Sequence, residues 1–159
     1  MKIIQELFFN IKKGNRWGAV CVLNYRIAHF FARRYLYIIG CPIILFYHIF
    51  FRHIVGFDIH EKASIGFPFS PWHCFGIAVN PHTIIGGGVK MAHNTTIGTK
   101  EMSKAPQIED NVIIGPSVVI IGDISIGNNV IIGAGSVVVK DIESNVVIAG
   151  NPSKIIKYL

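Results

Sequence analysis

The chain's candidates for acid–base chemistry are its seven histidines and nine carboxylates. One histidine, His73, lies in an aromatic-rich segment, residues 67–77, that also contains Phe67, Phe69, Trp72 and Phe75. A neutral imidazole accepts a proton near neutral pH, where a hydroxyl group is a poor nucleophile, so a histidine can serve as its general base. From the residues alone, the simpler interpretation is that His73 is a surface-loop residue and that Asp58 forms a turn.

Metal chemistry and disulfide chemistry are not indicated by the sequence. No group of Cys and His residues has the spacing of metal ligands, so we expect no metal site. The three cysteines, Cys21, Cys41 and Cys74, are odd in number and far apart, which argues against a disulfide framework. The reducing cytoplasm is therefore the expected location.

The elements that must position these residues follow from a repeat of six residues. Between residues 108 and 142 an aliphatic residue returns at every sixth position, at Ile108, Ile114, Ile120, Ile126, Ile132 and Val138. A helix has a period of 3.6 and a plain strand a period of 2, whereas a period of six is typical of a parallel β-helix. We expect the repeated residue to fill the core. Gly115, Gly127 and Gly133 are expected at corners, where a side chain would crowd or φ is positive.

The repeat begins earlier, at Ile59 and Ile65, and it is interrupted twice. The segment 67–77 is two residues longer than the period predicts. The second interruption, residues 99–107, makes the step from Ile97 to Ile108 eleven residues long. A segment that leaves a regular solenoid has no core role, so both interruptions are natural places for function.

The first 57 residues differ from the rest in charge and pattern. They carry eight Lys and Arg against the single Glu6, a net charge of +7, which leaves −1 for the remainder. We predict an amphipathic helix over residues 17–34, because Val20, Leu23, Ile27 and Phe31 fall at helical spacing. The apolar run 35–51 is expected to break at Gly40-Cys41-Pro42.

These features predict two helices that pack on the solenoid or on sister subunits. Contact with an anionic membrane surface is the alternative, and a membrane span is disfavoured because the run is short. Glu6 interrupts the first apolar run and no small-residue cleavage site follows, so we expect no signal peptide. No nucleic-acid motif accompanies the basic charge. The predicted organisation is a helical region (1–57), a β-helix (58–147) and a tail (148–159).

Several segments resemble the hexapeptide acyltransferases. They are Asp58-Ile59-His60, Gly76-Ile77-Ala78-Val79, Gly133-Ala134-Gly135-Ser136-Val137-Val138, Ala149-Gly150-Asn151-Pro152 and, in the helical region, residues 24–29. Within that superfamily the chain is similar to serine acetyltransferases, and more so to the short serine-acetyltransferase-like O-acetyltransferases of capsule and exopolysaccharide clusters, including the colanic acid acetyltransferases. The resemblance implies a mainly β fold, a left-handed parallel β-helix, that forms a homotrimer and binds acetyl-CoA between subunits.

The resemblance also implies roles for particular residues. His73 matches the histidine that deprotonates the acceptor hydroxyl, and Asp58 matches the aspartate that orients it. His93 lies about one coil beyond His73 and is a second candidate, for oxyanion stabilisation or acceptor binding. The residues matching the coenzyme A groove are Thr99, Pro116, Ala134, Ala149, Gly150 and, near the nucleotide phosphates, Lys154. Corner packing is the alternative role of Ala134.

The chain departs from serine acetyltransferases where those enzymes recognise the amino acid. They carry an Asp directly before the catalytic His and an Arg-His pair after the loop, and the matching positions are Trp72, Lys104 and Ala105. An indole offers the flat apolar area against which a sugar ring packs, so Trp72 and Lys104 are predicted acceptor-binding residues. Packing in a trimer interface is the alternative role of Trp72.

These inferences predict an O-acetyltransferase that uses acetyl-CoA to acetylate a sugar hydroxyl of a bacterial surface polysaccharide or its precursor. The expected location is the cytoplasm, with contact to the inner membrane as an added alternative. A serine O-acetyltransferase with a shortened helical domain is the second candidate function. A non-catalytic β-helix scaffold is the third.

Overall fold

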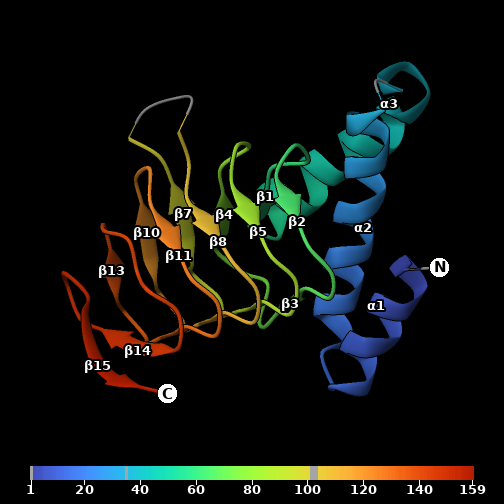
Figure 1. The fold of residues 1–159 in the computed structure, drawn as a ribbon. Helices are drawn as coiled ribbons and strands as arrows, with labels where there is room; N and C mark the ends of the chain where they lie inside the picture. The colour runs from blue at the N-terminus through green and yellow to red at the C-terminus, as the bar shows by residue number, and fades with distance from the viewer. Residues whose placement is uncertain (1, 35, 101–103) are drawn as a thin grey trace.

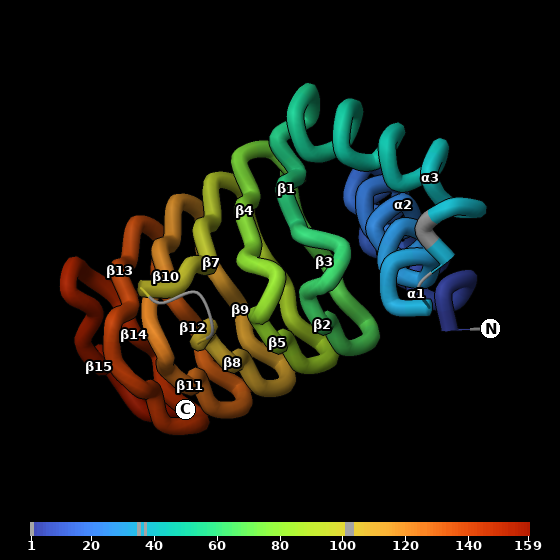
Figure 2. Tube along the Cα trace, turned by 90° about the horizontal axis from the view of Figure 1, so that it is seen from above, coloured from blue at the N-terminus to red at the C-terminus, as the bar shows by residue number. Residues whose placement is uncertain are grey.

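The computed structural model describes residues 2–34, 36–100 and 104–159 and shows a helical region at one end of a parallel β-helix (Figure 1). The helices are α1 (Lys2–Lys12), α2 (Arg16–Arg33), α3 (Tyr37–Phe46) and the π-helix η1 (Tyr47–Ile54). The coils advance from the helices toward the C-terminus, as Figure 2 shows.

Three sheets form the faces of the β-helix, and their strands are parallel except for the last strand of the third sheet. The last coil reaches the second sheet only through a bridge between Ile126 and Ile142. The first sheet has the order β1 (Phe57–Ile59), β4 (Ile77–Val79), β7 (Thr96–Gly98), β10 (Val119–Ile121), β13 (Val137–Val138). The second has the order β2 (Ser64–Ile65), β5 (Ile84–Ile85), β8 (Gln107–Ile108), β11 (Ser125–Ile126). The third has the order β3 (Ser70–Pro71), β6 (Lys90–Met91), β9 (Ile113–Ile114), β12 (Ile131–Ile132), β14 (Val146–Ala149), β15 (Lys154–Tyr158).

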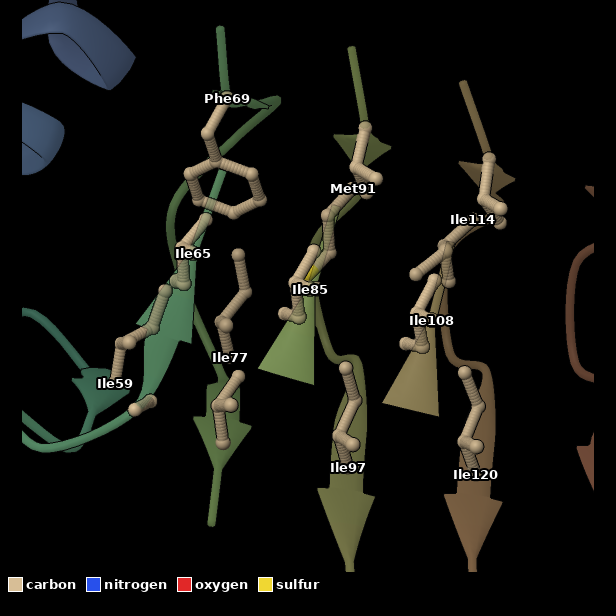
Figure 3. Packing of buried hydrophobic residues seen from close by; sticks show 14 of the residues in the cluster. Ile59, Ile65, Phe69, Ile77, Ile85, Met91, Ile97, Ile108, Ile114 and Ile120 are labelled. Carbon is tan, nitrogen blue, oxygen red and sulfur yellow. The ribbon is translucent and has the colours of Figure 1, made fainter. Parts of the chain in front are cut away.

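The aliphatic residues of the repeat stack in columns inside the prism. Ile97, for example, lies in register between Val79 and Ile120. The side chains of Ile85 and Ile108 stack in the same way on the second sheet (Figure 3). The predicted core role of the repeat is therefore confirmed.

The repeat glycines are explained by close packing between coils. A Cβ on Gly115 would lie 2.8 Å from the Ala134 nitrogen, and a Cβ on Gly133 would lie 2.9 Å from the Ala149 Cβ. Neither glycine has a positive φ. The left-handed positions are instead held by other glycines, such as Gly76 (φ 67°), and by polar residues such as Asn94 (φ 54°) and Asn111 (φ 60°), because Asn tolerates this conformation.

The predicted helix over residues 17–34 is confirmed within one residue by α2, but its packing face differs from the expected one. Val20 is 39% exposed, whereas the buried residues include Cys21, Tyr25, Ala28 and Ala32. Small side chains let the helix approach the first coil closely, and Tyr25 supplies a hydroxyl donor to it. Helix packing on the solenoid is thus achieved by a different stripe of residues.

The expected break at Gly40-Cys41-Pro42 does not occur, because α3 runs through Pro42. Pro42 lacks the N–H that would bond to the carbonyl of Ile38, and Ile38 lies at the surface, where water can bond to that carbonyl. Among the described residues, no helix has both the length and the apolar character needed to cross a membrane.

The helical region closes the open edge of the first coil. Strands β1, β2 and β3 each lie at the end of their sheet, so they would present unpaired backbone groups. Side-chain donors bond to these carbonyls instead: Asn10 to Phe69, Asn15 to Pro71, Tyr25 to Ala63, Arg26 to Ile65 and Gly66, and Tyr47 to Ile59. The helices thus take the place of a preceding coil.

A buried ion pair lies at the centre of this closure. Both carboxylate oxygens of Glu6 accept hydrogen bonds of 2.8 Å from Arg26, and one also accepts the backbone N–H of Phe69 at 2.8 Å. The Glu6 side chain is 2% exposed. The acidic residue that interrupts the first apolar run is therefore a structural contact between α1, α2 and the first coil.

The last strands close the other end of the β-helix. β14 runs to Ala149, two residues beyond the predicted boundary at 147. The following tail turns back, and β15 pairs antiparallel with β14. The tail therefore covers the outer edge of the third sheet with a strand.

Candidate active site

His73 lies at the corner between the third sheet and the first, and this corner carries the first interruption of the repeat. The step from Pro71 to Val79 is eight residues, whereas the equivalent steps in the next two coils are six. His73 is exposed and has a φ of 53°, a conformation that few non-glycine residues adopt and in which histidine is enriched. The two added residues thus push Trp72 and His73 outward.

The structure brings His73 and His93 together. Their ring centroids are 5.7 Å apart and their planes are nearly perpendicular. The Nδ1 atom of His93 is buried and has no hydrogen-bond partner among the described residues. A buried ring nitrogen without a partner is costly, so His93 is an unusual residue beside His73.

From His93 the same corner continues along the solenoid. Asn94 N–H donates to the Phe75 carbonyl, Ser117 N–H to the His93 carbonyl, and Gly135 N–H to the Pro116 carbonyl. Phe75, His93, Pro116 and Ala134 therefore occupy equivalent positions in successive coils. We call this line of residues, with His73 at its beginning, the His73 corner.

The tail joins the far end of the His73 corner. The carbonyl of Gly150 accepts the N–H of Val137, where the next coil would otherwise supply the acceptor. Ala149 pairs with Lys154 between β14 and β15, and Lys154 is exposed. At about 4.8 Å per coil, His73 and Gly150 are about 19 Å apart along the axis.

Two predicted site residues lie away from this corner. Thr99 follows β7 and Lys104 precedes β8, so both belong to the loop between the first and second sheets. The Thr99 hydroxyl donates to the Lys104 carbonyl, and Lys104 Nζ lies 3.2 Å from the Asp123 carboxylate. The part of this loop at residues 101–103 lies outside the described residues.

Asp58 lies on the first sheet, where its partner is Arg52 of η1. Arg52 Nε donates to Asp58 at 2.5 Å, and Arg52 also contacts Glu61 at 3.4 Å. His60 and His48 lie beside the same Glu61 carboxylate. Burial lowers the pKa of His60, although the nearby Glu61 opposes this shift. No hydrogen bond between Asp58 and His73 is present among the described residues, so the orienting role of Asp58 stays a prediction.

A groove opens beside His73, between the corner and the start of α2. Its volume is about 670 Å³, and it is lined by Lys13, Gly14, Asn15, Arg16, Trp17, Trp72, His73 and Phe75. The residues from the helical region were not predicted as site residues. Trp17 was visible at the start of the predicted helix, but its position near Trp72 depends on how α2 docks.

Two contacts hold α2 against the corner. The Asn15 side chain accepts the Gly18 N–H at the start of α2 and donates to the Pro71 carbonyl at 2.6 Å. Cys21 of α2 and Cys74 are both buried free thiols. A hydrogen bond with Cys74 and burial raise the pKa of Cys21, so this thiol stays neutral and serves as a packing group.

These contacts fix the position of the groove relative to His73. An exposed imidazole beside an aromatic groove can take a proton from a bound hydroxyl group.

In the part of the chain that the structure describes, no three His, Cys, Asp or Glu side chains are grouped so that they could hold a metal ion.

Comparisons with known proteins show which families have similar sequences and folds. Residues 105–140 match the family model described as bacterial transferase hexapeptide (six repeats). The protein named "putative colanic acid biosynthesis acetyltransferase WcaB" of Escherichia coli K12 is 31% identical over 153 residues, which cover 90% of this chain and 94% of WcaB. Serine acetyltransferase 2 of Arabidopsis thaliana is 38% identical over 109 residues, which cover 67% of this chain but 34% of that protein.

Solved structures show the same fold. The serine acetyltransferase of Brucella abortus strain S19 superposes with a TM-score of 0.78 at 28% identity, over 89% of this chain and 57% of that one. The soybean serine acetyltransferase complexed with serine has a TM-score of 0.78 at 30% identity, over 87% of this chain and 57% of that one. The predicted fold class, a left-handed parallel β-helix with an N-terminal helical region, is confirmed. The chain spans about a third of the length of the plant serine acetyltransferases it matches.

Proposed function

The chain belongs to the bacterial hexapeptide-repeat transferases, and on that premise we propose that it is an O-acetyltransferase. The proposed reaction transfers the acetyl group of acetyl-CoA to a sugar hydroxyl of a bacterial surface polysaccharide or of its precursor. The similarity to WcaB over almost the whole of both chains supports this choice of acceptor.

One observation carries the proposal: a single corner of the β-helix joins a candidate base to candidate coenzyme A contacts. His73 and His93 lie at its beginning, and the small or ring-constrained residues Pro116 and Ala134 follow in the next coils. The exposed Lys154 lies beside its far end, where an ammonium group suits a phosphate. An extended ligand with an anionic end therefore fits along the His73 corner.

The chemistry requires one proton acceptor near the acceptor hydroxyl. Acetyl-CoA supplies the acetyl group as an activated thioester when bound. His73 takes the proton of the acceptor hydroxyl as the hydroxyl oxygen attacks the thioester carbonyl carbon, which makes the imidazole cationic. The C–S bond then breaks to leave the acetyl ester, and the imidazolium gives the proton to the departing coenzyme A thiolate. His93 is the candidate for binding the acceptor or stabilising the charged oxygen, because its ring lies against that of His73.

The acceptor assignment rests on the residues beside His73. In serine acetyltransferases the position of Trp72 holds an aspartate that binds the ammonium group, and here an exposed indole occupies it. Lys104, at the position of the carboxylate-binding arginine, is paired with Asp123. The groove is therefore suited to a sugar ring and lacks the acidic group that a free amino acid needs.

We expect acetyl transfer to free serine to be near background and transfer to the correct glycan to be fast. A serine ammonium group that enters the groove without a carboxylate partner loses hydration, at a cost of several kcal/mol. Since about 1.4 kcal/mol corresponds to a tenfold change in rate, serine turnover should fall by orders of magnitude. Thiol release from acetyl-CoA, measured against serine and a panel of polysaccharide fragments, checks this expectation.

The matched variant for this assay is Trp72→Asp, which restores the acidic residue. It is expected to lower transfer to glycans and to raise transfer to serine. Efficient formation of O-acetylserine by the unchanged protein, with no product on any glycan, would establish the second candidate function instead.

We further propose that the protein is a homotrimer. Hexapeptide-repeat enzymes bind their substrates between subunits. In a single chain, the faces of the β-helix leave apolar side chains open to solvent, since Phe75 is 54% exposed and Ile84 is 50% exposed. Light scattering at micromolar concentration should therefore give three times the mass of the chain. The mass of a single chain in that experiment would exclude the trimer.

The helical region also exposes apolar residues that the first coil does not cover. They include Ile38, Ile39, Leu45, Phe46, Ile49 and Ile54. Arg33 and Arg34, at the end of α2, precede α3 in the sequence, so this part of the helical region combines exposed apolar residues with basic charge. We propose that the protein acts in the cytoplasm and that this surface contacts the inner membrane. Binding to vesicles with anionic lipids, and none to neutral vesicles, would support that location.

A further inference from the structure

The groove beside His73 contains both tryptophans of the chain. Trp17 lines it from the start of α2 and Trp72 lines it from the corner, and the chain has no other tryptophan. Trp17, which stacks on Phe51, is 41% exposed and Trp72 is 42% exposed, so the fold leaves part of each indole open to solvent. Two half-exposed indoles in one groove are suited to packing against flat rings such as sugars.

The same groove is positively charged. Lys13 and Arg16 line it, and no Asp or Glu is among its lining residues. A third cation, Lys90, lies with its Nζ 5.9 Å from the centroid of the Trp72 ring. Among the described residues, neither Lys13 nor Arg16 forms an ion pair with a carboxylate. Lys13 Nζ lies 5.9 Å from the centroid of the Phe9 ring, a contact that leaves its charge without a counter-ion in the described part of the chain, so both cations can still bind an anion.

We propose, on the basis of the proposed function, that the acceptor is an anionic carbohydrate. Lys13 and Arg16 bind its negatively charged group, while Trp17 and Trp72 pack against its ring and present a hydroxyl to His73. A carboxylate and a phosphate share this chemistry, because both accept charge-assisted hydrogen bonds from Lys and Arg.

Free amino acids fit the groove less well than an anionic sugar. Their carboxylate could bind Lys13 or Arg16, but their ammonium group would meet the same cations without a carboxylate partner. A neutral sugar would pack on the indoles and leave the cations unused. Only an anionic sugar uses both the aromatic and the charged lining.

The two tryptophans make the experiment direct, because all intrinsic tryptophan fluorescence comes from this groove. The purified protein is titrated with methyl β-D-glucuronide, glucose 1-phosphate and the neutral methyl β-D-glucoside. We expect a saturable fluorescence change with at least one anionic sugar. The affinity for the neutral glucoside should be weaker by about tenfold or more. The carboxylate and phosphate arms identify which anion the groove prefers.

Variants test the assignment of charge to particular residues. The double variant Lys13→Gln, Arg16→Gln should weaken binding of the anionic sugar by about tenfold, which corresponds to about 1.4 kcal/mol of binding free energy. Its affinity for the neutral glucoside should not change. Lys12→Gln is the matched control, because Lys12 is an exposed neighbour that does not line the groove. Trp17→Phe and Trp72→Phe assign the signal to each indole.

The outcomes separate this inference from the proposed function. Equal affinity for neutral and anionic sugars would overturn the inference. It would also be overturned if no sugar changed the tryptophan fluorescence while the protein acetylated a neutral glycan. A signal that responds only to dissociation of the subunits would identify the groove as a subunit contact and would also overturn it. Charge-dependent sugar binding without acetyl transfer to any glycan would support the inference and contradict the proposed function.

Discussion

Replacement of His73 by alanine is expected to lower the rate of acetyl transfer by about 10²–10⁴-fold, the range that general bases contribute. The physical reason is that the acceptor hydroxyl would keep its proton during attack. Because His73 is exposed and its ring lies beside that of His93, its replacement should leave folding and acetyl-CoA binding intact. Thiol release measures the rate of transfer, and acetyl-CoA binding, measured on the same preparation, shows whether the site is otherwise intact.

The matched control is His82→Ala, because His82 is an exposed histidine at another corner. Its rate should equal that of the unchanged protein. Near-normal turnover by His73→Ala would show that the base is assigned wrongly, and His93 would become the next candidate. Asp58→Asn is expected to lower the rate as well, although Asp58 forms an ion pair with Arg52.

Glu6→Ala is expected to lower the free energy of unfolding by about 3–5 kcal/mol, the cost of removing one partner of a buried ion pair. Arg26, whose side chain is 12% exposed, would lose both hydrogen bonds to the carboxylate. The backbone N–H of Phe69 would lose its acceptor too. At about 2–4 °C per kcal/mol for a domain of this size, the melting temperature should fall by about 6–20 °C. Thermal unfolding followed by circular dichroism measures the change.

Two further variants show whether the charge of Glu6 or its burial is responsible for the loss of stability. Glu6→Gln keeps an acceptor for Phe69 but removes the charge, so it should destabilise the fold less than Glu6→Ala. Glu143→Ala removes an exposed glutamate near the C-terminal strand and should change stability by less than about 0.5 kcal/mol. A Glu6→Ala protein as stable as the Glu143→Ala protein would contradict the structural role of the ion pair.

The β-helix could be predicted from the sequence because its period is local. Every sixth residue must fill a narrow prism, so Ile120 and Val138, three repeats apart, reveal their shared column without any three-dimensional information. The interruption at residues 67–77 could be predicted for the same reason, since a regular repeat makes two extra residues visible. The resemblance to a known family then supplied a role for His73.

The closure of the first coil could not be predicted, because it depends on contacts between distant segments. Glu6 and Phe69 are far apart in sequence, and nothing near Glu6 indicates that its carboxylate is buried. The packing face of α2 was missed for a related reason. Hydrophobic periodicity selected the large residues such as Val20, whereas close approach to a strand edge favours small residues such as Ala28 and Ala32.

The groove shows the same limit at the candidate site. Trp72 and His73 are neighbours in sequence, so their association was evident. Trp17 and Arg16 join them because α2 docks on the first coil, where the Asn15 side chain bonds to the Pro71 carbonyl and the Tyr25 hydroxyl bonds to the Ala63 carbonyl. Contacts between segments distant in sequence therefore decide which residues of the helical region line the groove.

The central claim is that acetyl transfer takes place at the His73 corner, and a crystal structure with bound coenzyme A tests it most directly. The account predicts that the ligand lies along this corner, with its sulfur beside the rings of His73 and His93 and its nucleotide end near Lys154. Coenzyme A bound along another edge of the β-helix, or in the reverse direction with its sulfur beside Lys154, would contradict the account.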